Sequence, residues 1–198
     1  MLKGIDVSHH NNLDKILSII DKPDFCIIKA TEGKTYEDPM LDKNIRTCLK
    51  KKITLGFYHY ARPELNNPID ECKNFLDKTQ FYAGNAIYAL DWEDKALNYP
   101  IKWAREFLNY FYYSTGVKPL IYTSAWYTSK LKPLLDDNVG LWVAHYTSKD
   151  KPEIGVYPFW AFWQYASPDH NYTSKPCVCD YDYFNGNFTQ LRKYMEKL

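Results

Sequence analysis

The stretch Ala86-Ile87-Tyr88-Ala89-Leu90-Asp91-Trp92-Glu93 contains the pattern that decides the fold. It begins with an unbroken apolar run, which is typical of a strand buried on both faces of a parallel sheet. Two carboxylic acids, Asp91 and Glu93, stand where this strand ends. Barrels of parallel strands place their chemistry at the carboxyl ends of the strands, so the stretch predicts such a barrel with acids at its rim.

Seven further runs rich in β-branched or aromatic residues lie along the chain, each bounded by turn residues. The expected strands are residues 2–7, 25–30, 54–60, 86–91, 120–123, 141–146, 159–165 and 177–184. Apolar residues with helical spacing follow Pro39, Pro68 and Pro100, and we expect each proline to occupy the first turn of a helix. Alternating strands and helices imply right-handed crossovers and a parallel sheet.

The connections after residues 146 and 165 carry no helical stripe, so we expect loops there. Eight strands, helices after the first five, and a length of 198 residues predict an α/β fold, a TIM-like (β/α)5(β)3 barrel that forms one catalytic domain over residues 1–198. An open doubly wound sheet is the alternative. It is disfavoured because no glycine-rich phosphate-binding motif follows any expected strand.

The composition limits the classes of partner. The chain has 25 Lys and Arg against 24 Asp and Glu, a net charge of +1, so no basic field attracts nucleic acid or an anionic membrane surface. Aromatic residues make up 17% of the chain, and their flat faces with polar rims suit sugar rings. A monomer is the default expectation for the oligomeric state.

The first residues and the cysteines bear on the compartment. The start, Met1 to Val7, lacks the apolar core of a secretory signal, so we expect synthesis in the cytoplasm without a signal peptide. The five cysteines include no CxxC pair, which favours reduced, mostly buried thiols over a disulfide framework or a zinc ribbon.

Four acids depart from the usual pattern of solvated surface charge: Asp6, Asp91, Glu93 and Asp180 each end or follow an expected strand. Side chains alternate along a strand, so Asp91 and Glu93 share a face, with α-carbons about 6.5 Å apart, while Trp92 points the other way. Two acids this close repel each other, and one should keep its proton to higher pH. A proton donor beside an ionised partner is what glycosidic cleavage requires.

Other chemistry fits less well. The same acids could hold Ca²⁺ or Mg²⁺, which is the alternative interpretation of their clustering. His9 and His10 are adjacent on a strand and face opposite sides, and His59 and His145 are single, so a packing or hydrogen-bonding role is favoured over metal ligation. No GxSxG motif supports a serine hydrolase. We expect neither a metal nor another cofactor.

Seven motifs, taken together and in this order, resemble glycoside hydrolase family 25, the Chalaropsis-type lysozymes or N-acetylmuramidases. They are Gly4-Ile5-Asp6-Val7-Ser8, Ile27-Ile28-Lys29-Ala30-Thr31-Glu32-Gly33, Gly56-Phe57-Tyr58-His59-Tyr60, Leu90-Asp91-Trp92-Glu93, Leu141-Trp142-Val143-Ala144-His145-Tyr146, Phe162-Trp163-Gln164-Tyr165 and Asp180-Tyr181-Asp182-Tyr183-Phe184. The resemblance covers nearly the whole chain. It implies a barrel of five β/α units and three further strands that cleaves the β-1,4 bond between N-acetylmuramic acid and N-acetylglucosamine in bacterial peptidoglycan without a metal.

The resemblance also assigns roles. Glu93 is similar to the family's general acid, and Asp91 to the carboxylate that orients or stabilises beside it. Asp6 and Asp180 match the two other acids of the groove. Four further residues match positions that line the groove and bind substrate: Lys29, Glu32, Tyr58 and Tyr122. The family's last motif usually has Asn where this chain has Asp182.

Two other functions compete with this hypothesis. A chitinase-like glycosidase of family 18 also ends its fourth strand in Asp-x-Glu, but it has another Asp where this chain has Ala89. A lectin-like barrel would bind wall glycan without cleaving it, yet a binder has no need of four clustered acids. The spacing of Asp91 and Glu93 does not decide between retention and inversion, whereas the resemblance points to net retention. By class, we expect release to the cell wall in the manner of a bacteriophage endolysin.

Overall fold

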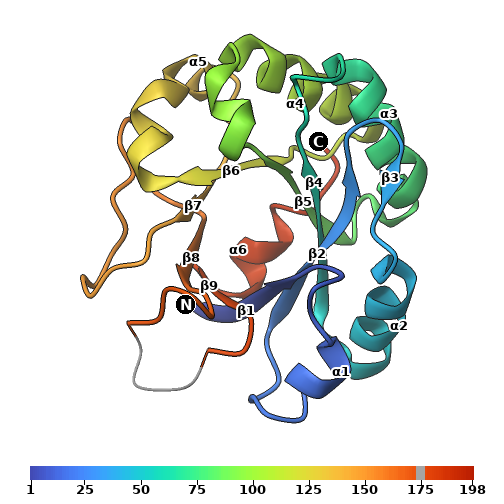
Figure 1. Ribbon diagram of the computed structural model, residues 1–198, viewed down its shortest axis with the longest axis vertical. Helices are drawn as coiled ribbons and strands as arrows, with labels where there is room; N and C mark the ends of the chain where they lie inside the picture. Colours follow the sequence, from blue (N-terminus) through green and yellow to red (C-terminus); the bar gives the residue numbers. More distant parts are fainter. Residues whose placement is uncertain (173–176) are drawn as a thin grey trace.

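The computed structural model describes residues 1–172 and 177–198, and in these residues nine strands form one sheet that closes on itself (Figure 1). Closure comes from the pairing of the first strand with the second. The strands are β1 (Leu2–Val7), β2 (Phe25–Glu32), β3 (Tyr36–Glu37), β4 (Thr54–Tyr60), β5 (Ala86–Asp91), β6 (Leu120–Ser124), β7 (Leu141–Ala144), β8 (Phe162–Ala166) and β9 (Asp180–Phe184). The short β3 pairs with the end of β2 alone, so eight strands make the barrel and the open-sheet alternative is wrong.

Helices and helical turns follow the first five barrel strands, as expected. They are α1 (Leu13–Ile16), α2 (Leu41–Lys51), α3 (Pro68–Thr79), η1 (Gln80–Tyr82), η2 (Asp94–Asn98), α4 (Ile101–Thr115), η3 (Ala125–Leu131), α5 (Lys132–Leu135) and, after the last strand, α6 (Phe188–Arg192). Residues 145–161, between β7 and β8, contain no helix. In the described part of the chain no helix combines the length and apolar character needed to cross a bilayer.

The position of the prolines differs from the expectation. Pro68 does lie in the first turn of α3, behind Asn67, whose side chain accepts a hydrogen bond from the backbone N–H of Asp70. Pro100 is instead the extended N-cap residue of α4, and Pro39 lies before the N-cap of α2. A proline restricts the residue before it as well as its own φ, so it marks the start of a helix to within a residue or two.

The last strand runs opposite to the other seven strands of the barrel. Neighbouring strands from β1 to β8 are parallel around the barrel, but β9 is antiparallel to both β1 and β8. The expectation of a wholly parallel barrel is therefore wrong for this strand. A parallel return needs a crossover, usually a helix, and the sequence between β8 and β9 has no helical stripe. As a result the first residue of β9, rather than its last, lies at the carboxyl-end rim.

Side chains fill the barrel and close its other end. Phe25, Ile27, Leu120 and Phe162 pack in the interior together with Leu191 of α6, which covers the end where the parallel strands begin. Gly4 is required there, because a Cβ at this position would lie 2.1 Å from the ring of Phe25. A second cluster lies between the barrel and the helices. The interior is thus a packed core, and the polar side chains gather at the opposite rim.

Candidate active site

Four acids meet at the carboxyl-end rim, where the sequence places them. Asp6 is the penultimate residue of β1 and pairs in register with Asp180, the first residue of β9. Asp91 ends β5, and Glu93 follows two residues later in extended backbone. The charges of Asp180 and Glu93 influence each other across the rim, so β1, β5 and β9 bring these acids into one site. Asp180 was expected at the end of a strand and reaches the site because β9 is reversed.

Asp91 and Glu93 are two carboxyls of this rim whose pKa values are raised. Asp91 is 5% exposed, and burial followed by the charge of Glu93 raises its pKa well above the usual value. Burial, then the charges of Asp94 and Asp180, raises the pKa of Glu93 to about 7. Trp92 is fully buried on the other side, with its ring 5.6 Å from that of Trp103. The expected alternation is therefore confirmed, and Glu93 can carry a proton near neutral pH.

Asp94 is a neighbour of this pair that the sequence interpretation missed. Its backbone is left-handed, with φ of 49°, an uncommon conformation for a residue other than glycine. Its carboxylate accepts a 2.6 Å hydrogen bond from the hydroxyl of Tyr60, which fixes the charge next to Glu93. No local pattern in the sequence signals this conformation.

Asp6 is held by a network centred on Gln164 of β8. The Gln164 amide nitrogen donates a 2.8 Å hydrogen bond to Asp6 Oδ2. The amide oxygen accepts hydrogen bonds from the hydroxyls of Tyr122, at 2.9 Å, and Tyr146, at 2.6 Å. Gln164 and Tyr146 were not named as site residues, although both stand in motifs quoted above. The two hydroxyls orient the amide, so that its nitrogen points to Asp6 and fixes that carboxyl.

β9 contributes two acids to the site. Burial, then the charge of Asp169, raises the pKa of Asp180 to about 6. Asp182 lies two residues further along and is fully buried, and its Oδ1 accepts a 2.8 Å hydrogen bond from the indole nitrogen of Trp142. Burial raises the pKa of Asp182, whereas hydrogen bonds from Asp6 and Trp142 lower it. The residue that departs from the family's usual Asn is thus part of the acid cluster.

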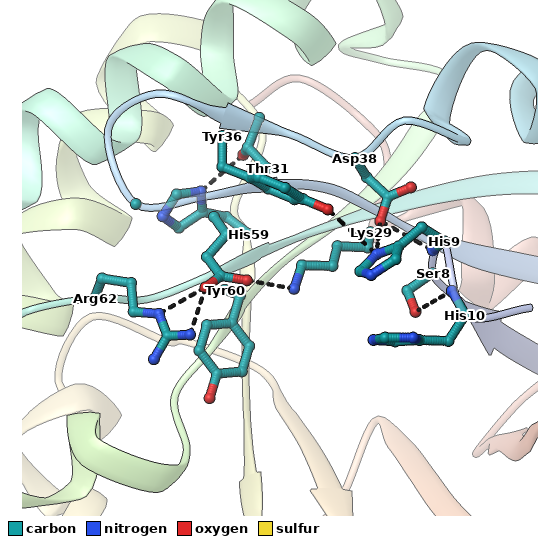
Figure 2. A network of polar contacts seen from close by, with 12 residues as sticks. Ser8, His9, His10, Lys29, Thr31, Tyr36, Asp38, His59, Tyr60 and Arg62 are labelled. Carbon is teal, nitrogen blue, oxygen red and sulfur yellow. Dashed lines mark hydrogen bonds and ion pairs between the residues drawn. The ribbon is translucent and has the colours of Figure 1, made fainter.

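Lys29 and Arg62, both labelled in Figure 2, form an ion-pair network with Glu32. The Lys29 ammonium is 2.6 Å from Glu32 Oε2 and lies 4.7 Å from the centroid of the Tyr60 ring, and the charge of Lys29 lowers the pKa of Asp91. Arg62 donates to Glu32 Oε1 at 2.7 Å. Burial would raise the pKa of Glu32, but hydrogen bonds from Lys29 and Arg62 hold it below the usual value. Glu32 therefore anchors two cations.

The two tyrosines expected at the groove also lie at the acids. Burial, then the charges of Asp6, Asp91 and others, raises the pKa of Tyr58 well above its usual value, so the phenol stays neutral. Its ring lies 6.3 Å from that of Trp142. Tyr122 is 8% exposed and contacts the same indole at 4.6 Å between ring centroids. Both tyrosines thus pack against Trp142 beside the acids, and Tyr122 lies in register with Asp91.

The histidines are engaged elsewhere. His59 is fully buried between Thr31, at 2.7 Å, and Glu71, at 2.8 Å. The sequence analysis expected His9 and His10 on a strand, but they lie in a turn after β1. The His9 Nδ1 atom is 2.9 Å from Asp38 Oδ2. Within residues 1–172 and 177–198, no three His, Cys, Asp or Glu side chains are arranged to hold a metal ion.

The comparison with known proteins now decides the family. The protein-family model described as "Glycosyl hydrolases family 25" matches residues 5–172 of the chain. The chain belongs to glycosyl hydrolases family 25. This membership makes it a glycoside hydrolase and rules out the family 18 alternative and the lectin-like alternative.

Three relatives illustrate the range of the family. A lysozyme of the same family from Aspergillus fumigatus has a structure that superposes with a TM-score of 0.77 at 28% identity, over 98% of this chain and 99% of that one. The uncharacterized protein YegX from Escherichia coli O157:H7 is 28% identical over 98% of this chain and 74% of its own length. An N,O-diacetylmuramidase from Arthroderma benhamiae is 25% identical over 98% of this chain and 86% of its own. This family 25 glycosidase thus matches bacterial and fungal proteins over nearly its full length.

Proposed function

We propose that this family 25 glycosidase cleaves the β-1,4 bond between N-acetylmuramic acid and N-acetylglucosamine in bacterial peptidoglycan, with Glu93 as the general acid. The observation that carries the proposal is the pair at the end of β5: Glu93, whose pKa is raised to about 7, stands beside the buried Asp91. A general acid works best with a pKa near the working pH. The names of the relatives, lysozyme and N,O-diacetylmuramidase, support the choice of substrate.

In the first step Glu93 donates its proton to the glycosidic oxygen, and positive charge develops on the sugar ring. Before this transfer Glu93 is neutral and does not repel the charge of Asp91, and Lys29 favours the ionised form of Asp91. The Asp91 carboxylate then stabilises the positive charge, either by attacking the anomeric carbon or by orienting the 2-acetamido group of the substrate for that attack. In the second step water attacks the anomeric carbon and loses a proton to Glu93, while the bond from that carbon to Asp91 or to the acetamido oxygen breaks. Two displacements at one carbon give net retention.

The remaining expected residues support this step. We assign Asp6 and Asp180 to the opposite wall of the groove, where Asp6 is fixed by Gln164. Tyr58 and Tyr122 offer aromatic surface beside the acids, and Lys29, held by Glu32, offers a cation beside Asp91. We further propose that residues 1–198 act as a single catalytic domain on the cell wall, with release of the endolysin type.

Mass spectrometry of the products from purified peptidoglycan tests the proposal. We expect fragments with N-acetylmuramic acid at the reducing end. Fragments that end in N-acetylglucosamine would show cleavage of the other glycosidic bond and would contradict it. The initial anomer, followed by NMR before mutarotation on a soluble oligosaccharide, should be β, whereas an initial α-anomer would exclude retention.

A further inference from the structure

Asp182 and Asp6 are brought together by the reversed strand β9. In the antiparallel register with β1, Asp180 lies opposite Asp6 and Asp182 lies opposite Gly4. Asp182 also pairs with Gln164 of β8, the residue whose amide holds Asp6. Asp182 therefore lies one layer deeper in the barrel than the rim acids. Asp182 is 0% exposed and Asp6 is 6% exposed, so bulk water does not solvate a charge on either carboxyl.

The hydrogen-bond donors around the two carboxyls are insufficient for two charges. Trp142 donates to Asp182 Oδ1 and Gln164 donates to Asp6 Oδ2. Asp182 Oδ2 is buried and accepts from no N–H or hydroxyl group among the described residues. A hydrogen bond between the two carboxyls raises the pKa of Asp6 and lowers that of Asp182. Two carboxylates repel at hydrogen-bond distance, whereas an acid and a carboxylate share a proton and form a strong hydrogen bond.

We propose that Asp6 and Asp182 share one proton, and that Asp182 is a positioning residue that keeps Asp6 neutral at the wall of the groove. The proton sits on Asp6 and is donated to Asp182 Oδ2, which gives that buried oxygen its missing partner. The single negative charge rests on Asp182, where the indole N–H of Trp142 stabilises it. The pair then behaves as one titrating unit.

The charge of the pair matters for the site around it. Other titratable groups that face it from the neighbouring strands and loops are Asp180, Asp91, Glu93, Tyr58, Tyr122, Tyr146, Cys26 and Cys179, with Lys29 as the cation nearest to Asp91 and Glu93. A second negative charge on the pair would add to the repulsion that already acts on Asp180 and the pair at the end of β5. Sharing a proton keeps this part of the site at one charge. This consequence for catalysis rests on the proposed function, whereas the shared proton does not.

The proton can be counted by measuring stability against pH. An aspartate protonated in the folded state but ionised in the unfolded state makes the protein less stable as pH rises between the two pKa values. The unfolded pKa of an aspartate is about 3.9, and burial, with the charges of Asp180 and Asp182, raises the pKa of Asp6, which carries the shared proton, well above that in the folded state. The pair therefore releases one proton when the whole chain unfolds in urea between about pH 6.5 and pH 7.5. That proton increases the unfolding constant about tenfold per pH unit.

Asp182→Asn should remove this contribution without changing the charge of the native pair. The new amide can donate to Asp6, which becomes ionised in place of Asp182. The unfolding constant of the variant should then rise about tenfold less per pH unit than that of the wild type. Asp6→Asn should have the same effect on the slope, and the double variant should have no additional effect, because one proton is shared. Asp180→Asn is the matched control on the same strand: since the pKa of Asp180 is about 6, the slope above that pH should stay as in the wild type.

Parallel stability curves for the wild type and Asp182→Asn would overturn the proposal, as would a double variant that loses two protons. Infrared spectra of the wild type alone guard against a variant that does not fold. The carbonyl band of a protonated carboxylic acid should persist to a pH above the range in which Glu93 ionises. If no such band remains there, the pair does not hold a proton. None of these measurements depends on turnover, so the result stands apart from the test of the proposed function.

Discussion

The two carboxyl pairs of this barrel differ in how they are held. At the end of β5, Asp91 Oδ1 is buried without a hydrogen-bond partner among the described residues, and Glu93 is flanked by charges that repel it. Across the barrel, Asp6 and Asp182 are each fixed by a donor, Gln164 and Trp142. One pair is poised to move a proton, whereas the other is arranged to retain one.

The difference shows how one fold gives similar residues separate tasks. Both pairs are buried, so desolvation alone raises the pKa of each carboxyl and does not distinguish them. What distinguishes them is hydrogen bonding. Fixed hydrogen-bond donors hold a carboxyl in one protonation state. Without such donors, a group that binds in the groove can change the protonation of the carboxyl.

The largest effect is expected at Glu93. Glu93→Gln keeps the shape of the side chain but removes the transferable proton, so the rate of wall lysis should fall by about 10²-fold or more. The fold should be unchanged, as judged by circular dichroism and thermal unfolding. A folded variant with the wild-type rate of turbidity loss on purified cell walls would contradict the role of Glu93.

Asp91→Asn should rank next, with a loss of about tenfold or more in kcat. The amide cannot supply the negative charge that stabilises the developing positive charge on the sugar, although it preserves the packing against Trp103 through Trp92. Steady-state kinetics on soluble peptidoglycan fragments separate kcat from KM. Full activity would mean that Asp6 or Asp180 supplies the charge, and the contrast between the two pairs would be lost.

A smaller effect is expected from the network around Asp6. Tyr146→Phe removes one of the two hydroxyls that bind the Gln164 oxygen, and a net hydrogen bond of about 1 kcal/mol corresponds to about a fivefold loss of activity. Tyr157→Phe is the matched control, because the buried Tyr157 hydroxyl has no hydrogen-bond partner among the described residues. Its removal should leave the rate unchanged. Equal losses in the two variants would assign the effect to general packing.

No effect is expected from a chelator. The proposed steps use carboxyl groups alone, so EDTA should leave the rate of wall lysis unchanged. A rate that falls in EDTA and returns with a divalent ion would restore the calcium or magnesium interpretation of the acids.

Much of the barrel and its rim could be predicted from the sequence because each strand has a recognisable local pattern of apolar and polar residues. The apolar run before Asp91 identified β5, and the alternation after it correctly placed Trp92 opposite the acids. The direction of β9 could not be predicted in this way. An alternating strand has the same pattern in both directions. Asp180 was therefore predicted at the correct rim, but as the carboxyl end of its strand, whereas it is the first residue of β9.

The contacts that tune the acids lie beyond any local pattern. Gln164 and Asp6 are separated by 158 positions in the chain, and Trp142 and Asp182 by 40. Such partners are set by barrel closure and register, which depend on all strands at once. Likewise the left-handed backbone of Asp94 follows from its place after the barrel strand and has no sequence signal of the kind that a glycine gives.

The central claim is that the proton of Glu93 drives cleavage, and the pH dependence of kcat/KM tests it most directly. The pKa of Glu93 is raised to about 7, so the active protonated form is present below that pH and is lost as pH rises through it. We expect the wild-type rate to fall by about tenfold per pH unit above about pH 7, and the residual activity of Glu93→Gln to lack this decline. A decline that persists unchanged in Glu93→Gln would place the catalytic proton on another residue and would contradict the account.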